Sequence, residues 1–232
     1  MTAPSKVALI VGAGPGISAG FAEALRADGY EVALASRQPD RLAALAGRLG
    51  ARAFPAEAGD RRSITDLFSA VDRTLGAPEV VLYNASARPR GEFLSIDPDV
   101  ALESLRTTAY GAFLTAQETA KRMLPRGRGA LFFTGATASV KGFAKSSVFA
   151  MSKFAVRGLA QSLARELSPQ GIHVGHVVVD GGIRNPGRTE PPDKPDSMLD
   201  PGAIAEAYLY LLQQPRSAWT WEIELRPWVE RF

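Results

Sequence analysis

Three glycines spaced two residues apart form the segment best suited to bind a phosphate. Gly12, Gly14 and Gly16 lie in the run 12–18 (GAGPGIS), between an apolar stretch and a helical pattern. Without side chains, glycines let the backbone turn tightly and approach a pyrophosphate closely. The unpaired N–H groups and the positive dipole end of the following helix would attract the phosphates. We therefore predict a dinucleotide site here, with an ordinary glycine-rich turn as the alternative.

Ser36 and Arg37 end the next apolar run, where many NAD sites carry an acidic residue. A carboxylate there accepts hydrogen bonds from ribose hydroxyls but repels a 2′-phosphate, whereas a hydroxyl and a guanidinium can bind that phosphate. The pair favours NADP(H), while NAD(H) stays possible. Nearby Arg41, Arg61 and Arg62 can add positive charge. A solvated arginine at a strand end is the alternative interpretation.

Short apolar runs that alternate with longer helical patterns position these residues. This alternation is typical of βαβ units and a parallel sheet. The expected strands are 6–11, 31–35, 52–56, 80–83, 130–134, 172–179 and 220–225. The expected helices are 16–28, 40–49, 63–75 with Ser63 as its cap, 97–124, 147–167 and 200–212. Since no repeat divides the chain, we predict one doubly wound, Rossmann-like α/β domain over 1–232, with a parallel sheet of about seven strands.

The composition excludes several kinds of site. There is no cysteine, which excludes disulfides, thiolate catalysis and thiolate metal sites. His173 and His176, the two histidines, are too few for a histidine-rich metal site and are expected to be structural. The net charge of +3 is spread along the chain, so nucleic acid is not an expected partner. No apolar run reaches membrane-spanning length and residues 1–6 lack a signal-peptide pattern, so we expect a cytoplasmic protein.

The chain resembles the short-chain dehydrogenase/reductase family over nearly its whole length. The glycine turn is similar to the family's TGxxxGIG element, although Ser18 replaces the final glycine. Residues 84–87 (NASA) resemble its NNAG, whose asparagine ties strands together and whose following backbone lies against the adenosine ribose. Residues 57–58 stand where the family has an Asp-Val pair beside the adenine, and 180–183 where it contacts the nicotinamide carboxamide. The implied cofactor-binding residues are Gly12, Gly14, Gly16, Ile17, Ser36, Arg37, Glu57, Ala58, Asn84, Ala85, Ser86, Lys153, Gly181 and Ile183.

The family's catalytic Tyr-x-x-x-Lys matches residues 149–153, in which Phe149 replaces the tyrosine and Lys153 keeps the lysine. The resemblance implies that Lys153 holds the nicotinamide ribose hydroxyls and adds positive charge at the reacting centre. Ala136 stands at the family's serine position, and Thr108 at its asparagine position. Carbonyl reduction needs a proton or a strong hydrogen bond on the developing alkoxide, so another donor is required. Thr137 is the first candidate, with local backbone bonding as its alternative role.

Three functions remain open. We favour an NADP(H)-dependent oxidoreductase acting on a small carbonyl, alcohol or related substrate through an atypical or degenerate proton-donor site. The further candidate donors are Ser139, Ser146, Ser147, Tyr110 and Lys153. The second function is a non-catalytic NADP(H)-binding module, either a redox sensor or a partner subunit of an active relative. The third is a purely structural domain, which predicts no cofactor binding.

Two segments near the carboxyl end have features of their own. Residues 181–200 are rich in glycine and proline and would lie over the carboxyl ends of the strands, as a substrate lid or as a surface loop. The tail 219–228 contains three tryptophans and predicts an edge strand at a subunit contact. The family resemblance implies a homodimer or homotetramer built on the fourth and fifth helices.

Overall fold

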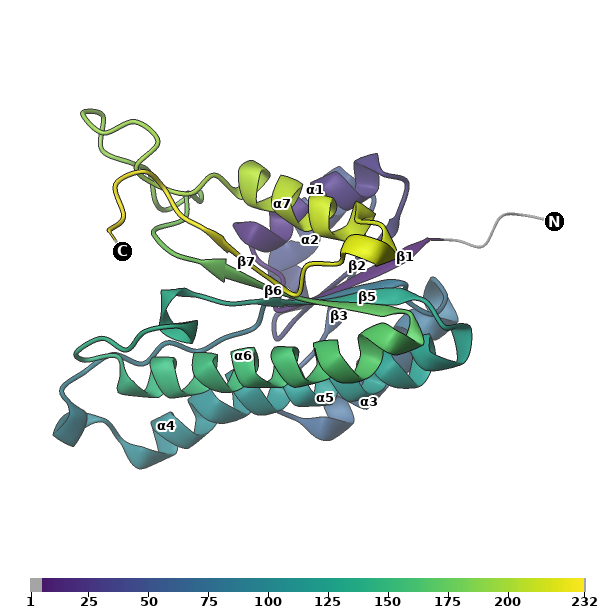
Figure 1. Cartoon of the computed structure of the whole chain (residues 1–232), viewed down its shortest axis with the longest axis horizontal. Helices are drawn as coiled ribbons and strands as arrows, with labels where there is room; N and C mark the ends of the chain where they lie inside the picture. Colours follow the sequence, from purple (N-terminus) through teal and green to yellow (C-terminus); the bar gives the residue numbers. More distant parts are fainter. Residues whose placement is uncertain (1–5, 232) are drawn as a thin grey trace.

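Seven strands form the middle layer of the molecule, between two layers of helices (Figure 1). Their order is β3-β2-β1-β4-β5-β6-β7, and every neighbouring pair is parallel. The strands are β1 (Val7–Val11), β2 (Glu31–Ser36), β3 (Arg52–Pro55), β4 (Val80–Tyr83), β5 (Gly129–Thr134), β6 (Ile172–Val179) and β7 (Glu222–Leu225). The predicted single doubly wound α/β domain with a seven-stranded parallel sheet is therefore confirmed.

The computed structural model describes residues 6–231. Residues 1–5 and 232 lie outside the described residues. Most of the segment 1–6, for which we noted no signal-peptide pattern, therefore lies outside them too. Within 6–231, no helix combines the length and the apolar character needed to cross a membrane.

The helices divide between the two faces of the sheet, as Figure 1 shows. One face carries α1 (Ile17–Ala27), α2 (Ala43–Leu49) and α7 (Pro201–Gln213). The other carries α3 (Arg61–Thr74), α4 (Pro98–Leu105), α5 (Gly111–Met123) and α6 (Ser147–Leu167). This two-sided cover explains why the central strands are apolar throughout rather than alternating.

Strand β1 shows how one run of residues supplies both cores. All five of its residues are buried. Leu9 packs in the core under α3, α5 and α6, whereas Ile10 packs in the core under α1 and α7, because successive side chains point to opposite faces. Burying each such aliphatic side chain contributes about 1.5–3 kcal/mol. The strand that precedes the glycine turn is thus fixed on both sides.

Two helix boundaries differ from the prediction. Helix α3 begins at Arg61, and its cap is Asp60, whose carboxylate accepts a 2.6 Å hydrogen bond from the Ser63 N–H. The Ser63 hydroxyl instead accepts from the Glu57 N–H at 2.8 Å, so its assignment as the cap was wrong. An aspartate three residues upstream meets the same capping geometry and starts the helix earlier.

The helix expected over 97–124 is also not continuous. A π-helical stretch, Arg106–Tyr110, separates α4 from α5. Within it, the carbonyl of Thr107 accepts a hydrogen bond from the Tyr83 hydroxyl at the end of β4. The apolar periodicity of the sequence does not reveal this change of winding. Such π turns are frequent at functional sites.

Candidate active site

Two adjoining cavities lie at the carboxyl ends of the strands. The larger, of about 1150 Å³, lies beside the ends of β5 and β6 and the first turns of α6. The smaller, of about 240 Å³, lies at the ends of β1 and β2. Asn84 and Ser86, which follow β4, line both cavities. The order of the strands reverses at β1, and an open α/β sheet binds its ligands at such a point. An elongated ligand can therefore extend from one cavity into the other.

The smaller cavity is built around the glycine turn. Gly12 has a φ of +84°, and a Cβ on it would clash with the backbone of Ala85. Most of the predicted cofactor-binding residues line this cavity: Gly12, Ser36, Arg37, Glu57, Ala58, Asn84, Ala85 and Ser86. Gly14 and Gly16 lie in the turn itself and line neither cavity, but a Cβ on either would meet no atom within 4 Å. The turn is thus open on the side of Gly14 and Gly16.

Ser18 has a role in this turn that the sequence did not predict. Its fully buried hydroxyl donates to the Gly12 carbonyl at 3.2 Å and accepts from the Asn84 side-chain amide at 2.9 Å. The same amide also reaches the Gly12 carbonyl, at 3.2 Å. The Asn84 side chain therefore joins β4 to the turn and to α1. A serine where the resemblance has a glycine was the only sequence signal of this contact.

Lys153 lies buried in the larger cavity. Its ammonium donates a 2.7 Å hydrogen bond to the Thr134 carbonyl at the end of β5. Burial lowers the pKa of Lys153 to about 8, because the charged form is removed from water. Phe149, one helical turn earlier on α6, places the centre of its ring 5.9 Å from the Lys153 ammonium. The two side chains share one face of α6, as their spacing predicts.

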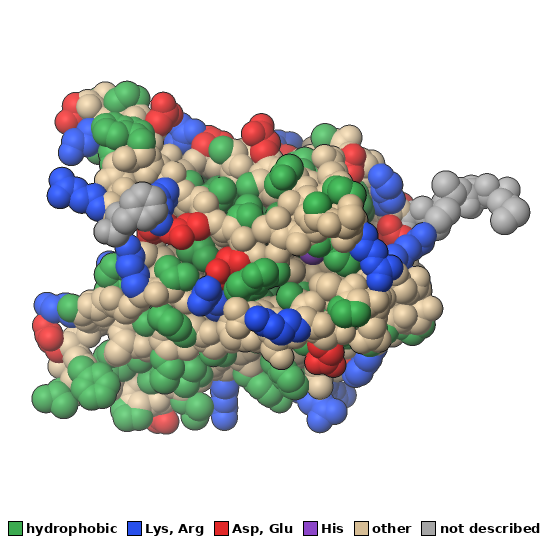
Figure 2. All heavy atoms as spheres, viewed as in Figure 1, with side chains coloured by type: hydrophobic (Ala, Val, Ile, Leu, Met, Phe, Trp, Pro, Cys, Tyr) green, Lys and Arg blue, Asp and Glu red, His purple; other side chains and the backbone are tan. Residues whose placement is uncertain are grey.

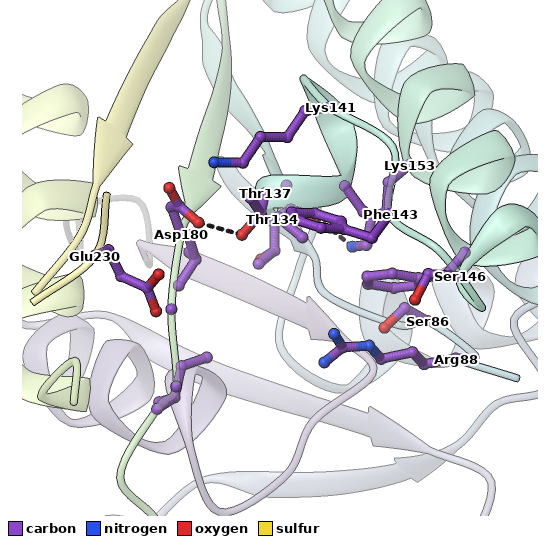
Figure 3. A pocket seen from close by; sticks show the side chains of 18 of the residues that line it. Ser86, Arg88, Thr134, Thr137, Lys141, Phe143, Ser146, Lys153, Asp180 and Glu230 are labelled. Carbon is purple, nitrogen blue, oxygen red and sulfur yellow. Dashed lines mark hydrogen bonds between the residues drawn. The ribbon is translucent and has the colours of Figure 1, made fainter. Parts of the chain in front are cut away.

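Five more of the predicted site residues line the larger cavity: Ile17, Ala136, Thr137, Gly181 and Ile183. The Thr137 hydroxyl donates to the Asp180 carboxylate, a contact visible in Figure 3.

Thr108 is set apart from this group. It is fully buried, lines neither cavity, and its hydroxyl accepts from the Ala87 N–H at 3.0 Å. Of the further candidate donors, Ser146 lines the larger cavity, whereas Ser139, Ser147 and Tyr110 line neither.

The sequence analysis missed several charged residues of the larger cavity. Arg88, Arg90 and Lys141 contribute basic side chains, and Glu230 contributes a carboxylate from the chain's tail. Figure 2 shows basic side chains gathered around the hollow at the left edge of this face. The only sequence signal was the position of Arg88 and Arg90 shortly after Asn84.

The fold and these cavities define a class of protein. A doubly wound parallel sheet, with a glycine turn where its strand order reverses, is the architecture of the nucleotide-binding Rossmann proteins. Residues 6–190 match the model of the family described as short chain dehydrogenase. The chain therefore belongs to the short-chain dehydrogenase family, whose members are oxidoreductases that bind nicotinamide cofactors.

Individual relatives agree with this assignment. An uncharacterized oxidoreductase of Staphylococcus aureus (strain N315) is 29% identical over 231 residues, which cover 96% of this chain and 97% of the relative. A short-chain dehydrogenase from Rhodopseudomonas palustris is 34% identical, with a TM-score of 0.83, covering 96% of this chain and 99% of that one. An alcohol dehydrogenase from the archaeon Thermococcus sibiricus, complexed with 5-hydroxy-NADP, is 26% identical with a TM-score of 0.86, covering 98% of each chain.

Proposed function

We propose that the chain is an NADP(H)-dependent oxidoreductase that interconverts a small carbonyl compound and its alcohol. The observation that carries this proposal is the pair of adjoining cavities, with Arg37 in the smaller and buried Lys153 in the larger. A phosphate-binding guanidinium at one end and an ammonium at the other match the two ends of NADP. The bound cofactor would supply the hydride to the carbonyl carbon, or accept it from the alcohol.

The residues around the cavities fit such a cofactor. The open turn at Gly14 and Gly16 would hold the pyrophosphate against backbone N–H groups and the start of α1. Lys153 would hold the ribose hydroxyls of the nicotinamide. The remaining proposed contacts are Gly12, Ile17, Ser36, Arg37, Glu57, Ala58, Asn84, Ala85 and Ser86 on the adenosine side and along the turn, and Gly181 and Ile183 beside the nicotinamide.

NADP is proposed in preference to NAD because Arg37 lines the smaller cavity immediately after β2. No hydrogen bond or ion pair links its guanidinium to a carboxylate among residues 6–231, which leaves its charge available for a 2′-phosphate. The complex of the related alcohol dehydrogenase with 5-hydroxy-NADP supports the same choice.

The proton-donor site is proposed to be atypical, with Phe149 and Ala136 in place of the family's tyrosine and serine. Thr137 was the first candidate for a replacement, but its hydroxyl proton is directed to Asp180. Lys153 has three N–H donors, of which the Thr134 carbonyl takes one. A lysine with a pKa of about 8 also releases its proton more readily at neutral pH than an ordinary lysine. We therefore place the hydrogen bond to the developing alkoxide on Lys153.

The loop 181–200 is proposed to act as a lid. Gly181, Gly182 and Ile183 line the larger cavity at its start. At its other end, the N–H of Leu199 donates to the Gly182 carbonyl at 2.7 Å, and the Arg184 side chain pairs with Asp200. The loop is thus anchored at its base, beside the larger cavity.

Self-association of the chain also remains a proposal. Val100 on α4, Phe113 on α5 and Phe154 on α6 are exposed apolar side chains on the helices that the family resemblance assigns to subunit contacts. Strand β7 lies at the edge of the sheet, as expected, and Trp219 beside it stacks on His173 with ring centres 4.8 Å apart. Sedimentation analysis of the purified chain tests whether these surfaces bring copies together.

Cofactor binding and NADPH oxidation together test the proposed function. Calorimetry is expected to show binding of NADPH, and a panel of carbonyl, imine and enone substrates is expected to include some that oxidise it. The double variant Phe149→Tyr, Ala136→Ser should raise carbonyl turnover if the site is a degenerate version of the family's. Binding without turnover of any class would instead identify a non-catalytic cofactor-binding module, and absence of binding would exclude both functions.

A further inference from the structure

Basic side chains outnumber acidic ones much more strongly in the larger cavity than in the chain as a whole. Seven lysines and arginines line it against two carboxylates, whereas the chain has 27 basic and 24 acidic residues. The basic residues are Arg88, Arg90, Lys141, Lys145, Lys153, Arg188 and Arg231, and the acidic residues are Asp180 and Glu230. A concave surface lined by charge of one sign concentrates ligands of the opposite sign.

Several of these charges already have partners. Lys145 pairs with Glu92 at 2.7 Å, and Lys153 donates to the Thr134 carbonyl. Asp180 accepts from Thr137 and lies 3.5 Å from the Arg226 guanidinium, and among residues 6–231 no ion pair joins it to Arg88, Arg90 or Arg188. The cavity therefore contains basic groups that its own carboxylates do not neutralise.

Arg88, Arg90 and Arg188 are the clearest case. Among residues 6–231, no hydrogen bond or ion pair joins any of their guanidinium groups to a carboxylate. They come from two separate loops, the segment after β4 and the loop 181–200, yet they lie close enough to affect one another. Burial lowers the pKa of Arg88, and repulsion by Arg90 and Arg188 lowers it further. Like charges brought together without a counter-charge are typical of a site that binds an anion.

Phe149 positions Arg88 beside the proposed reaction centre. The guanidinium carbon of Arg88 lies 4.9 Å from the centre of the Phe149 ring, a cation–π contact. The same ring lies near the Lys153 ammonium. Figure 3 shows Arg88 reaching into the cavity from beside Ser86, across from Asp180 and Glu230. The arginine is therefore held next to the place where the carbonyl would be reduced.

We infer that Arg88, with Arg90 and Arg188, binds a carboxylate or phosphate group of the substrate, so that the enzyme acts on an anionic carbonyl compound. This inference rests on the proposed function, because it names the substrate class for the same cavity. The planar guanidinium donates two parallel hydrogen bonds to either group, which an ammonium cannot do. Since Arg188 belongs to the loop 181–200, a bound anion would also hold that loop over the site.

Matched substrates provide the first test. We would compare each 2-oxo and 3-oxo acid with its methyl ester, and a phosphorylated ketone with its free alcohol, as substrates for NADPH oxidation. The anionic member of a pair is expected to have a kcat/KM about 10- to 100-fold higher, because hydrogen bonds to a charged group stabilise a complex by about that factor. The acid pairs and the phosphate pair distinguish the two kinds of anion. Equal turnover of the charged and neutral members would overturn the inference.

The Arg88→Ala variant provides the second test. It should remove most of the preference for the anion, measured as the ratio of kcat/KM for the acid to kcat/KM for its ester. Arg88→Lys keeps the charge but loses the planar guanidinium that donates two parallel hydrogen bonds, so it should recover only part of the preference. Arg128→Ala is the matched control, because Arg128 pairs with Glu79 at 2.9 Å and lines neither cavity.

A binding measurement separates this inference from the proposed catalysis. The NADP-loaded protein is titrated with malonate and with inorganic phosphate, neither of which can be reduced. Binding of one of them that Arg88→Ala weakens, with unchanged NADPH affinity, would support the anion site even if no carbonyl turned over. If Arg88→Ala weakened NADPH binding instead, the arginines would belong to the cofactor site and the inference would fail, while the proposed function would stand.

Discussion

The buried hydroxyl of Ser18 accepts a 2.9 Å hydrogen bond from the side-chain amide of Asn84, and both groups donate to the Gly12 carbonyl. Three elements, β4, α1 and the glycine turn, thus meet at one small polar cluster beside the two cavities. A buried polar group that loses its partner costs about 1–3 kcal/mol. The cluster therefore fixes the turn to the sheet before any ligand binds.

We predict that Asn84 and Ser18 are energetically coupled. Asn84→Ala should lower the free energy of unfolding by about 1–3 kcal/mol, because it removes the donor to Ser18. Urea denaturation of Asn84→Ala, Ser18→Ala and the double variant gives the coupling energy, which we expect to exceed about 0.5 kcal/mol. Strictly additive effects of the two substitutions would contradict the shared hydrogen bond.

Two glycines of the same turn should respond differently to alanine. Gly12→Ala should destabilise the protein by more than about 2 kcal/mol, because Gly12 has a positive φ and its Cβ would clash with Ala85. The Cβ that Gly14→Ala adds would meet no atom within 4 Å, so the free energy of unfolding should stay within about 0.5 kcal/mol of that of the parent. If the turn holds a pyrophosphate, Gly14→Ala should nevertheless weaken NADPH binding in calorimetry. Unchanged binding would remove the turn from the cofactor site.

Arg37 should decide between the two cofactors. Arg37→Ala is expected to reduce the affinity for NADPH at least about tenfold and to leave the affinity for NADH nearly unchanged, because only NADPH has the 2′-phosphate. Arg48→Ala is the control, since Arg48 pairs with Glu23 at 2.6 Å and lines neither of the two cavities. Isothermal titration with both cofactors gives the ratio. An equal loss for NADH would show that Arg37 does not contact the phosphate.

The sequence predicted the elements better than it predicted the contacts between them. Helix α6 and strands β4 and β6 were predicted at their observed bounds, because apolar periodicity and flanking glycines or prolines are local signals. The role of Ser18 was missed because its partner, Asn84, lies 66 residues away. Arg88 was missed for the same reason, since its contact with Phe149 depends on how a loop packs against α6. The spacing of residues in the sequence shows which side chains are neighbours on one helix or strand, but not which side chains of different elements come into contact.

Strand β6 should make the stability depend on pH through His176. Its Nδ1 lies 2.9 Å from Glu222, and burial lowers its pKa to about 4. The unfolded chain would therefore bind a proton below about pH 6.5 that the folded chain refuses, so stability is lost as pH falls from 6.5 towards 4. The loss amounts to about 3 kcal/mol. The free energy of unfolding of His176→Asn, measured by denaturation at several pH values, should change less between pH 6.5 and 4 than that of the parent. A change as large as the parent's would contradict the assignment.

Lys153 needs its proton for the role proposed here, so the activity should depend on pH. Since burial lowers its pKa to about 8, kcat/KM for carbonyl reduction should fall as pH rises above about 8. Lys153→Arg should move that fall to higher pH, even if its activity is low, because a guanidinium keeps its proton. If kcat/KM of Lys153→Arg still fell near pH 8, the group that titrates there would not be Lys153.

The same lowered pKa predicts an independent effect on stability. Between about pH 8 and 10.5 the unfolded chain binds a proton that folded Lys153 has released, so the free energy of unfolding should rise with pH across this range. Lys153→Met should abolish that rise, and at pH 7 it should not destabilise the protein, because it no longer buries a charge beside the Thr134 carbonyl. The variant should at the same time lose affinity for NADPH. Stability retained while binding is lost would show that the lysine is kept for the cofactor and the substrate rather than for the fold.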